Sequence, residues 1–150
     1  MTGAVLRPDT AAQVREAIRD AAGPLVIEGG GGLGGFGRPV QAQATLKLDA
    51  LVGVVEYSPS ELYASFRAGT TLEAARAVLA EKGQRLPFDP PDLTGLYGRQ
   101  GPATVGGVVA AALSGPARIA AGAARDYLIG VKFVDGVGQA LHGGGRVMKN

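Results

Sequence analysis

A run of glycines between Gly29 and Gly37 has the residue types that bind phosphate through the backbone. The segment reads Gly-Gly-Gly-Gly-Leu-Gly-Gly-Phe-Gly and directly follows the apolar run Leu25–Glu28. Successive N–H groups in such a loop can surround an anionic oxygen, because no Cβ blocks the approach or restricts φ. The pattern predicts an anion-binding loop after a strand. A mobile surface loop is an equally weighted alternative for this segment alone.

Three known phosphate motifs can be tested against this loop. Gly30, Gly32 and Gly35 satisfy GxGxxG, but the dinucleotide fingerprint requires a helix directly after it. Here Pro39 and a polar stretch without helical period follow, so we reject that interpretation. The kinase glycine loop is excluded because the chain has neither HRD nor DFG, and no GxxxxGK[ST] is present.

A second glycine-containing segment precedes an alanine-rich apolar run. Thr104, Val105, Gly106 and Gly107 lead into the run that ends at Leu113. A helix N-terminus offers unpaired N–H groups and a partial positive charge, which predicts a second phosphate or carbonyl contact. Taken alone, the segment fits a buried helix packed against a sheet better. Two glycine-rich segments in one small domain favour a large phosphate-bearing cofactor.

The composition limits the classes of protein to consider. The chain has 150 residues, 46% of them hydrophobic and 19% charged, which is one domain's length and excludes intrinsic disorder. Its net charge is +2 without any Lys/Arg run, so no nucleic-acid partner is expected. The absence of cysteine excludes disulfides and thiolate chemistry. The most apolar stretch, 103–113, is too short to span a bilayer, and no signal peptide fits the N-terminus.

The elements that must position the glycines follow from periodicity and capping signals. Helices are predicted from a Thr10–Gln13 capping box to Gly23, from a Thr70–Glu73 capping box to Gly83, and over 105–113. A long proline- and glycine-rich loop separates the last two. Strands are predicted at 25–28, 45–48, 53–57 and 62–67, at a segment holding Leu128, Val131 and Phe133, and at 138–141 after an Asp135-Gly136 turn. Because the strands alternate with helices and then form hairpins, we predict an α+β fold.

The order of these motifs resembles the FAD-binding domain of the vanillyl-alcohol oxidase type, also called PCMH-type. The resemblance rests on the glycine loop, on Val55-Glu56-Tyr57-Ser58-Pro59 through Gly69, on Gly83 to Pro90, on Ala103 to Gly115, and on the spaced set Gly122, Arg125, Asp126, Gly130, Val134 and Gly136. It covers nearly the whole chain in the family's order. Three runs, 86–91, 113–116 and 144–150, resemble the FAD-binding subunits of bacterial glycolate oxidases within that family.

This resemblance implies two α+β subdomains with a noncovalent FAD between them. It implies that residues 1–150 form a partial FAD-binding domain, incomplete at the C-terminus because the family motif continues past Asn150, without a substrate-capping domain. The implied FAD contacts are Gly29, Gly30, Gly31, Gly32, Leu33, Pro87, Thr104, Gly106, Gly107, Ser114, Gly115, Gly122, Arg125 and Asp126. Read from the residues alone, Arg125 and Asp126 fit an ordinary ion pair equally well. No catalytic residue is assigned, and His142, the single histidine, is given no role.

The resemblance also implies a function. The complex would oxidise a small 2-hydroxy acid such as glycolate, with hydride transfer to FAD, beside a second flavoprotein subunit and an iron–sulfur subunit. The expected location is cytoplasmic, with any membrane association made through those partners. A non-catalytic flavin-binding or assembly subunit that supports a catalytic paralogue is the alternative. One departure concerns charge: where the family usually has a basic residue, this chain has Glu28.

Overall fold

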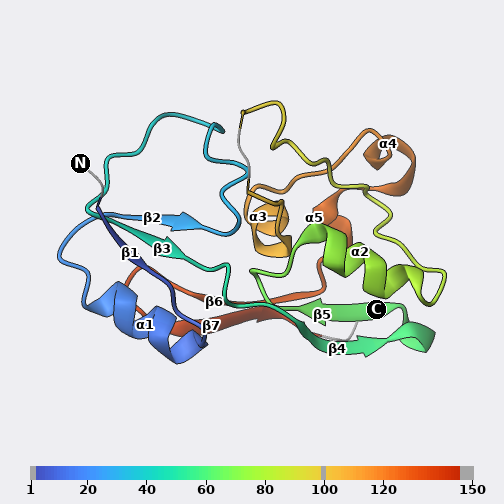
Figure 1. The fold of residues 1–150 in the computed structure, drawn as a ribbon. Coiled ribbons are helices and arrows are strands. Elements are labelled where there is room, and N and C mark those ends of the chain that lie inside the picture. The colour runs from blue at the N-terminus through green and yellow to red at the C-terminus, as the bar shows by residue number, and fades with distance from the viewer. Residues whose placement is uncertain (1–2, 99–100, 146–150) are drawn as a thin grey trace.

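The architecture combines one parallel sheet, two β-hairpins and five short helices (Figure 1). A computed structural model describes residues 3–98 and 101–145. In chain order the elements are β1 (Ala4–Leu6), α1 (Ala11–Arg19), β2 (Leu25–Glu28), β3 (Ala44–Lys47), β4 (Val54–Ser58), a 3₁₀ turn (Pro59–Glu61), β5 (Tyr63–Phe66), α2 (Leu72–Ala80), α3 (Val105–Ala110), α4 (Arg118–Ala121), α5 (Ala124–Tyr127), β6 (Gly130–Val134) and β7 (Ala140–Gly144). The predicted α+β class is confirmed.

The parallel sheet places the glycine loop. Its strand order is β1-β3-β2, and residues 44–46 of β3 pair with both neighbours, so Leu46 is almost fully buried. Helix α1 begins as predicted, because the Thr10 hydroxyl accepts from the Gln13 amide, while the Gln13 side chain accepts from Asp9 N–H. The chain leaves β2 at Glu28 and enters the glycine loop without forming a helix, which agrees with rejecting the dinucleotide fingerprint.

The two hairpins are antiparallel, as predicted. β4 pairs with β5 through a register shift between Val54 and Glu56, and β6 pairs with β7 around the Asp135 turn, where Asp135 N–H donates to the Gln139 carbonyl. The turn of the second hairpin lies against α1, because the Arg15 guanidinium donates to the Gly138 carbonyl at 3.2 Å. This hydrogen bond joins the second hairpin to α1, the helix beside the parallel sheet.

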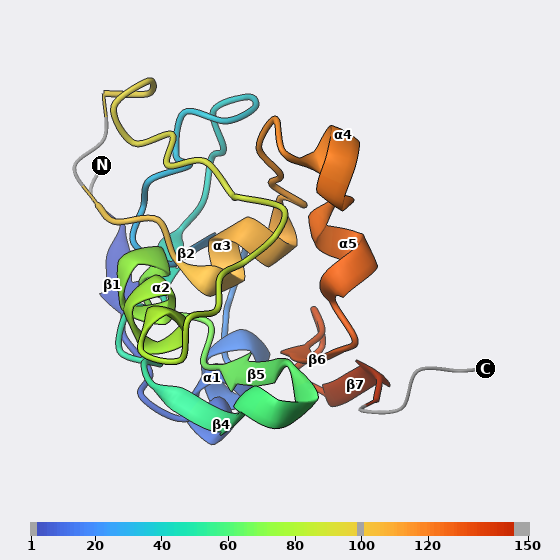
Figure 2. The same ribbon diagram turned by 90° about the vertical axis from the view of Figure 1, so that its right-hand side faces the viewer.

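The apolar core lies between three helices. Figure 2 shows α3 between α2 and α5. Leu72 of α2, Val108 of α3 and Ala124 of α5 are buried together with Phe88, whose ring lies 5.8 Å from that of Tyr127. Helix α3 is therefore fixed on one side by the core, and its other side is left to face the glycine loop.

Several predicted boundaries were wrong, each for a local reason. Helix α2 is capped by Thr71, whose hydroxyl accepts from Ala74 N–H, because the Thr70 hydroxyl instead bonds to both backbone groups of Gly53. Its C-terminal stop at Gly83, with a φ of +66°, agrees with the prediction. Helix α3 ends at Ala110 because Ala112 takes a left-handed φ of +49° and Leu113 N–H returns to the Val108 carbonyl.

Three further boundaries shift by a few residues. Helix α1 ends at Arg19, well before Gly23. Strand β3 runs over 44–47 where 45–48 was predicted, and β6 begins at Gly130, so Leu128 precedes the strand. The helices α4 and α5 were not predicted, because four-residue helices lack a readable period. None of the described helices is long and apolar enough to cross a membrane.

Candidate functional site

A large cavity lies between the glycine loop and α3. Its volume is about 780 Å³, which lies within the range of small-molecule and cofactor sites. It is lined by residues 26–40, by Pro91–Thr94, by Pro102–Thr104, and by Gly107, Val108, Ala110, Ala111 and Leu113. The end of β2 thus opens directly into a cofactor-sized space.

The glycine loop brings unused backbone donors to this cavity. Within residues 3–98 and 101–145, no acceptor is found for the amides of Gly30, Gly31, Gly32 and Leu33. Gly32 is itself buried. Unpaired N–H groups away from water are costly, so these four consecutive amides are expected to bind an anionic group. These free amides fit the anion-loop interpretation, and the binding of an anion there stays a prediction.

Most glycines of the loop are needed for protein contacts, a reason the sequence analysis did not give. An added Cβ at Gly29 would lie 2.4 Å from Thr104 Oγ1, and one at Gly30 would lie 2.0 Å from the Pro102 carbonyl oxygen. At Gly32 it would meet the Thr94 methyl group at 2.7 Å. Residues 94–97 and 101–104 therefore pack against the loop backbone and hold the loop's shape.

The tips of the two loops also touch. An added Cβ at Gly35 would lie 2.8 Å from the Tyr97 ring, and the Phe36 ring meets the Tyr97 ring edge-on with centroids 6.4 Å apart. Gly31 differs from these glycines, because its φ of +82° is a conformation that only glycine adopts easily, while nothing lies within 3.9 Å of an added Cβ. The loop is thus held at its base and at its tip.

The start of α3 differs from the expectation that its N-terminal N–H groups are unpaired. Its first amides are not free: Val105 N–H donates to the Thr70 carbonyl, Gly106 N–H to the Ala68 carbonyl, and Gly107 N–H to the Thr104 hydroxyl. Gly106 is required because an added Cβ would lie 2.8 Å from Ala68. This helix start joins two parts of the fold, and Thr104 and Gly107 are its residues that line the cavity.

The structure brings together half of the predicted contact residues. Seven of the fourteen line the cavity, namely Gly29, Gly30, Gly31, Gly32, Leu33, Thr104 and Gly107. Gly106 lies behind them against Ala68. The remaining residues, Pro87, Ser114, Gly115, Gly122, Arg125 and Asp126, do not line it. That any of these fourteen residues contacts FAD remains a prediction.

Those outlying residues form a second group around α5. Gly115 N–H donates to the Phe88 carbonyl beside Pro87, and the Ser114 hydroxyl accepts from Ala124 N–H. Asp126 accepts from Ala123 N–H at 2.8 Å and lies 3.7 Å from Arg125 Nε, and both side chains are exposed. These contacts fix the entry to α5.

Among the described residues, three charged side chains line the cavity: Glu28, Arg38 and Asp92. Thr94 N–H donates to Asp92 Oδ1 at 2.9 Å, and this backbone hydrogen bond, reinforced by the Thr94 side chain, lowers the pKa of Asp92. The sequence analysis missed the Pro91–Thr94 segment, although Asp-x-Thr after two prolines is a readable turn signal. In the part of the chain that the structure describes, no group of three or more metal-ligating side chains comes together.

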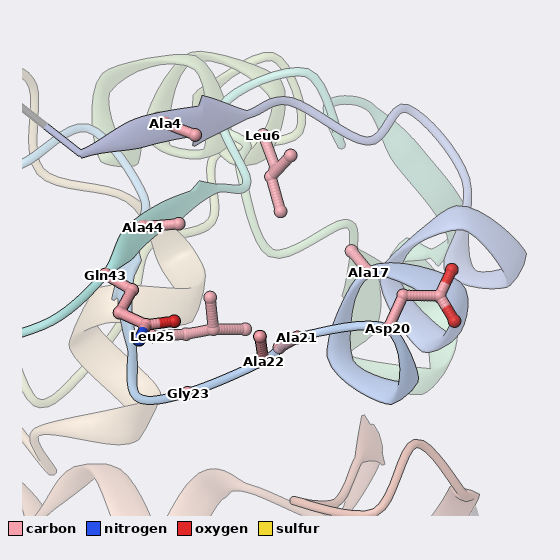
Figure 3. A pocket seen from close by; sticks show the side chains of 10 residues that line it. All are labelled: Ala4, Leu6, Ala17, Asp20, Ala21, Ala22, Gly23, Leu25, Gln43 and Ala44. Carbon is pink, nitrogen blue, oxygen red and sulfur yellow. The ribbon is translucent and has the colours of Figure 1, made fainter.

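A smaller cavity of about 330 Å³ lies between β1, β3 and the turn that follows α1 (Figure 3). It is lined mainly by small apolar side chains such as Ala17, Ala21 and Leu25. Asp20 and Gln43 are its polar lining side chains, which gives it no grouping of donors comparable to the glycine loop. The larger cavity is therefore the candidate site.

Comparisons with known proteins agree on one family. A family model described as the FAD binding domain matches residues 2–144. The chain is 44% identical over 138 residues to glycolate oxidase subunit GlcE of Escherichia coli strain K12, covering 92% of this chain and 37% of that protein. It is 26% identical to D-2-hydroxyglutarate dehydrogenase of Xanthomonas citri pv. viticola, over 98% of this chain and 30% of that protein.

A solved structure supports the fold. p-Cresol methylhydroxylase with substrate bound superposes with a TM-score of 0.68 at 19% identity, over 92% of this chain and 26% of that one. At this identity the likeness concerns the fold. The chain spans roughly a third of the length of the relatives it matches.

Proposed function

This chain belongs to the family of FAD-binding domains, and we propose that it is the FAD-binding portion of a glycolate oxidase-like subunit. The observation that carries the proposal is 44% identity to glycolate oxidase subunit GlcE over 92% of the chain. The proposed reaction is oxidation of a small 2-hydroxy acid with hydride transfer to FAD. Because the chain spans 37% of that relative, substrate and partners belong to the proposal.

The residues present fit FAD. Four consecutive unpaired amides at Gly30–Leu33, one of them in a buried glycine, suit a pyrophosphate, and the cavity of about 780 Å³ suits a large ligand. FAD, when bound, supplies the two-electron chemistry that the side chains do not. Thr104, Gly107 and the apolar side of α3 form the opposite wall.

The chain's own contribution is therefore binding and placement. The glycine-loop amides orient the anionic part of the cofactor, and residues 94–97 and 101–104 keep those amides in position. The group around α5, with Pro87, Ser114, Gly115, Gly122, Arg125 and Asp126, is proposed to contact the cofactor beyond the cavity. A second flavoprotein subunit and an iron–sulfur subunit are the proposed partners that pass electrons onward.

The first test is retention of flavin. The purified chain is mixed with FAD, passed through a gel-filtration column, and its visible absorption spectrum recorded; retained flavin bands are the expected result. Gly31→Val places a side chain at a φ of +82° beside the anion loop and should abolish retention. Gly136→Ala is the matched control, because nothing lies within 4 Å of an added Cβ there. A colourless wild-type chain would contradict the proposal.

A second candidate function is supported by the lining of the cavity. Its titratable side chains among the described residues are Glu28, Arg38 and Asp92, without a histidine or a base paired with a nucleophile. This favours a flavin-binding subunit that supports a catalytic paralogue. Anaerobic mixing of the flavin-loaded chain with glycolate or D-lactate separates the two, because bleaching of the flavin band without a partner would exclude the supporting role.

A further inference from the structure

Glu28 is a carboxylate at the base of the anion-binding loop. It is the last residue of β2, is half-buried, and lines the large cavity. An added Cβ on Gly31 would lie 3.9 Å from Glu28 Oε1, so the carboxylate lies beside the loop backbone whose amides are unpaired. A negative charge beside an anion site needs a physical explanation.

The protein does not neutralise this carboxylate. Lys47 is the neighbour of Glu28 in the sheet register, but its ammonium lies 3.7 Å from Asp49 Oδ2. No hydrogen bond or ion pair to the Glu28 side chain is found among residues 3–98 and 101–145. The other cavity carboxylate, Asp92, differs because Thr94 N–H already donates to it. Glu28 is therefore an acceptor left for a ligand.

The chemistry of an ionised carboxylate decides which ligand group it can take. It only accepts hydrogen bonds, and it repels phosphate. Hydroxyl groups are donors that a carboxylate binds strongly, and an acidic side chain that holds a ribose diol is a known solution in nucleotide sites. In FAD the pyrophosphate is flanked on both sides by hydroxyl-bearing chains, the adenosine ribose and the ribityl group.

We propose that Glu28 is a specificity-determining residue that accepts hydrogen bonds from hydroxyl groups next to the cofactor's pyrophosphate, while the amides of residues 30–33 bind the pyrophosphate itself. This inference rests on the proposed function. The site then distinguishes a polyhydroxylated pyrophosphate ester from free pyrophosphate, since the free anion meets only repulsion from Glu28.

The test compares FAD with inorganic pyrophosphate by calorimetric titration of the full chain. In Glu28→Ala the Kd for FAD should rise about tenfold, because a charge-assisted hydrogen bond is lost, and the Kd for pyrophosphate should fall about threefold, because repulsion is removed. Glu28→Gln keeps an acceptor oxygen and the side-chain volume, so the same opposite shifts are expected at smaller size. Circular dichroism melts check that each variant folds.

Asp92→Asn is the matched control. It removes a negative charge from the same cavity but keeps an oxygen for Thr94 N–H. Charge removal alone should lower both Kd values slightly. If Glu28→Ala and Glu28→Gln also lower both, Glu28 only repels and the proposal is overturned. A wild-type chain that binds no FAD is a different result, which overturns the proposed function.

Two further ligands identify the hydroxyl groups. ADP carries the ribose diol, and FMN carries the ribityl chain. Weaker binding of ADP by Glu28→Gln assigns the contact to the ribose, and weaker binding of FMN assigns it to the ribityl group. Unchanged affinity for both ligands contradicts the proposal.

Discussion

The two glycine-rich segments around the cavity use their backbone in opposite ways. In the loop at 29–37, four consecutive amides have no acceptor among the described residues, while several glycine α-carbons pack against residues 94–97 and 101–104. At the start of α3, the amides of residues 105–107 are all bonded within the protein. The first segment packs against protein through its α-carbons, and no acceptor for the N–H groups of residues 30–33 is found among the described residues. The second uses its N–H groups to join two parts of the fold.

This difference shows what a glycine count cannot distinguish. Both segments contain glycines because another backbone or side chain comes too close for a Cβ, at Gly30 as at Gly106. The close neighbour is protein in both cases. The capacity to bind an anion is set by the hydrogen bonds of the amides, which the sequence does not display.

The largest expected effect comes from disturbing the contact between the glycine loop and the residues that pack against it. In Gly30→Ala the new methyl group would lie 2.0 Å from the Pro102 carbonyl oxygen, so one segment must move. We expect the free energy of unfolding to fall by about 2–3 kcal/mol, measured by urea denaturation, and flavin retention to be lost. Gly95→Ala, with nothing within 4 Å of its Cβ, is the control. Equal stability of the two variants would contradict the role of the Pro102 contact in supporting the loop.

A smaller effect is expected at the start of α3. Thr104→Val removes the hydroxyl that accepts from Gly107 N–H, and the free energy of unfolding should fall by about 1–2 kcal/mol. Because the hydroxyl also lines the cavity, the Kd for FAD should rise roughly threefold to tenfold. Thr71→Val removes the same kind of cap from α2 outside the cavity, and it should change stability alone. An unchanged FAD affinity in Thr104→Val would make that segment purely structural.

A glycine should stabilise the protein at a position where the backbone has a positive φ and the sequence has another residue. Ala112, just after α3, has a φ of +49°, a conformation that costs an L-residue about 1–2 kcal/mol. Ala112→Gly should therefore raise the free energy of unfolding by about 1 kcal/mol, measured by urea denaturation. Ala110→Gly, at the last residue of α3, should instead lower it, by no more than about 1 kcal/mol. A loss of stability in both variants would contradict this assignment.

The smallest expected effect concerns pH. The hydrogen bond from Thr94 N–H lowers the pKa of Asp92 below its ordinary value of about 4. A lowered pKa in the folded state means that this contact stabilises the cavity wall above pH 4 and that the contribution is lost as pH falls through the lowered pKa. Asp92→Asn keeps an acceptor that does not titrate, so stability measured between pH 5 and pH 3 (about the range of the titration) should fall less steeply. An identical slope would show that Asp92 contributes nothing.

The sequence predicted elements with local signals and missed what depends on distant contacts. The Thr10 cap, the Gly83 stop and the Asp135 turn each depend on neighbours within a few residues, and all three were correct. Thr70 and Thr71 are equally good caps by type, and only the contact of Thr70 with Gly53 decides between them. The motif order gave the family, and the local pattern placed the anion loop after a strand.

The partner that each site residue contacts could not be predicted from the sequence in the same way. Whether Gly106 faces a ligand or Ala68 depends on how the chain returns from α2. Whether Glu28 has an ion-pair partner depends on Lys47, which pairs with Asp49 instead. These are choices between partners of similar chemistry at long sequence separation. A single sequence does not rank them.

The support of the glycine loop also has a consequence for how the protein is made. Gly30 is held by Pro102 and Gly101, about seventy residues later in the chain, so the loop's closure is a late, non-local event. During synthesis from the N-terminus, β2 and its glycines emerge well before the segment that fixes them. We therefore expect FAD to bind only at the end of folding. Until then, the four amides of residues 30–33 remain exposed in the nascent chain.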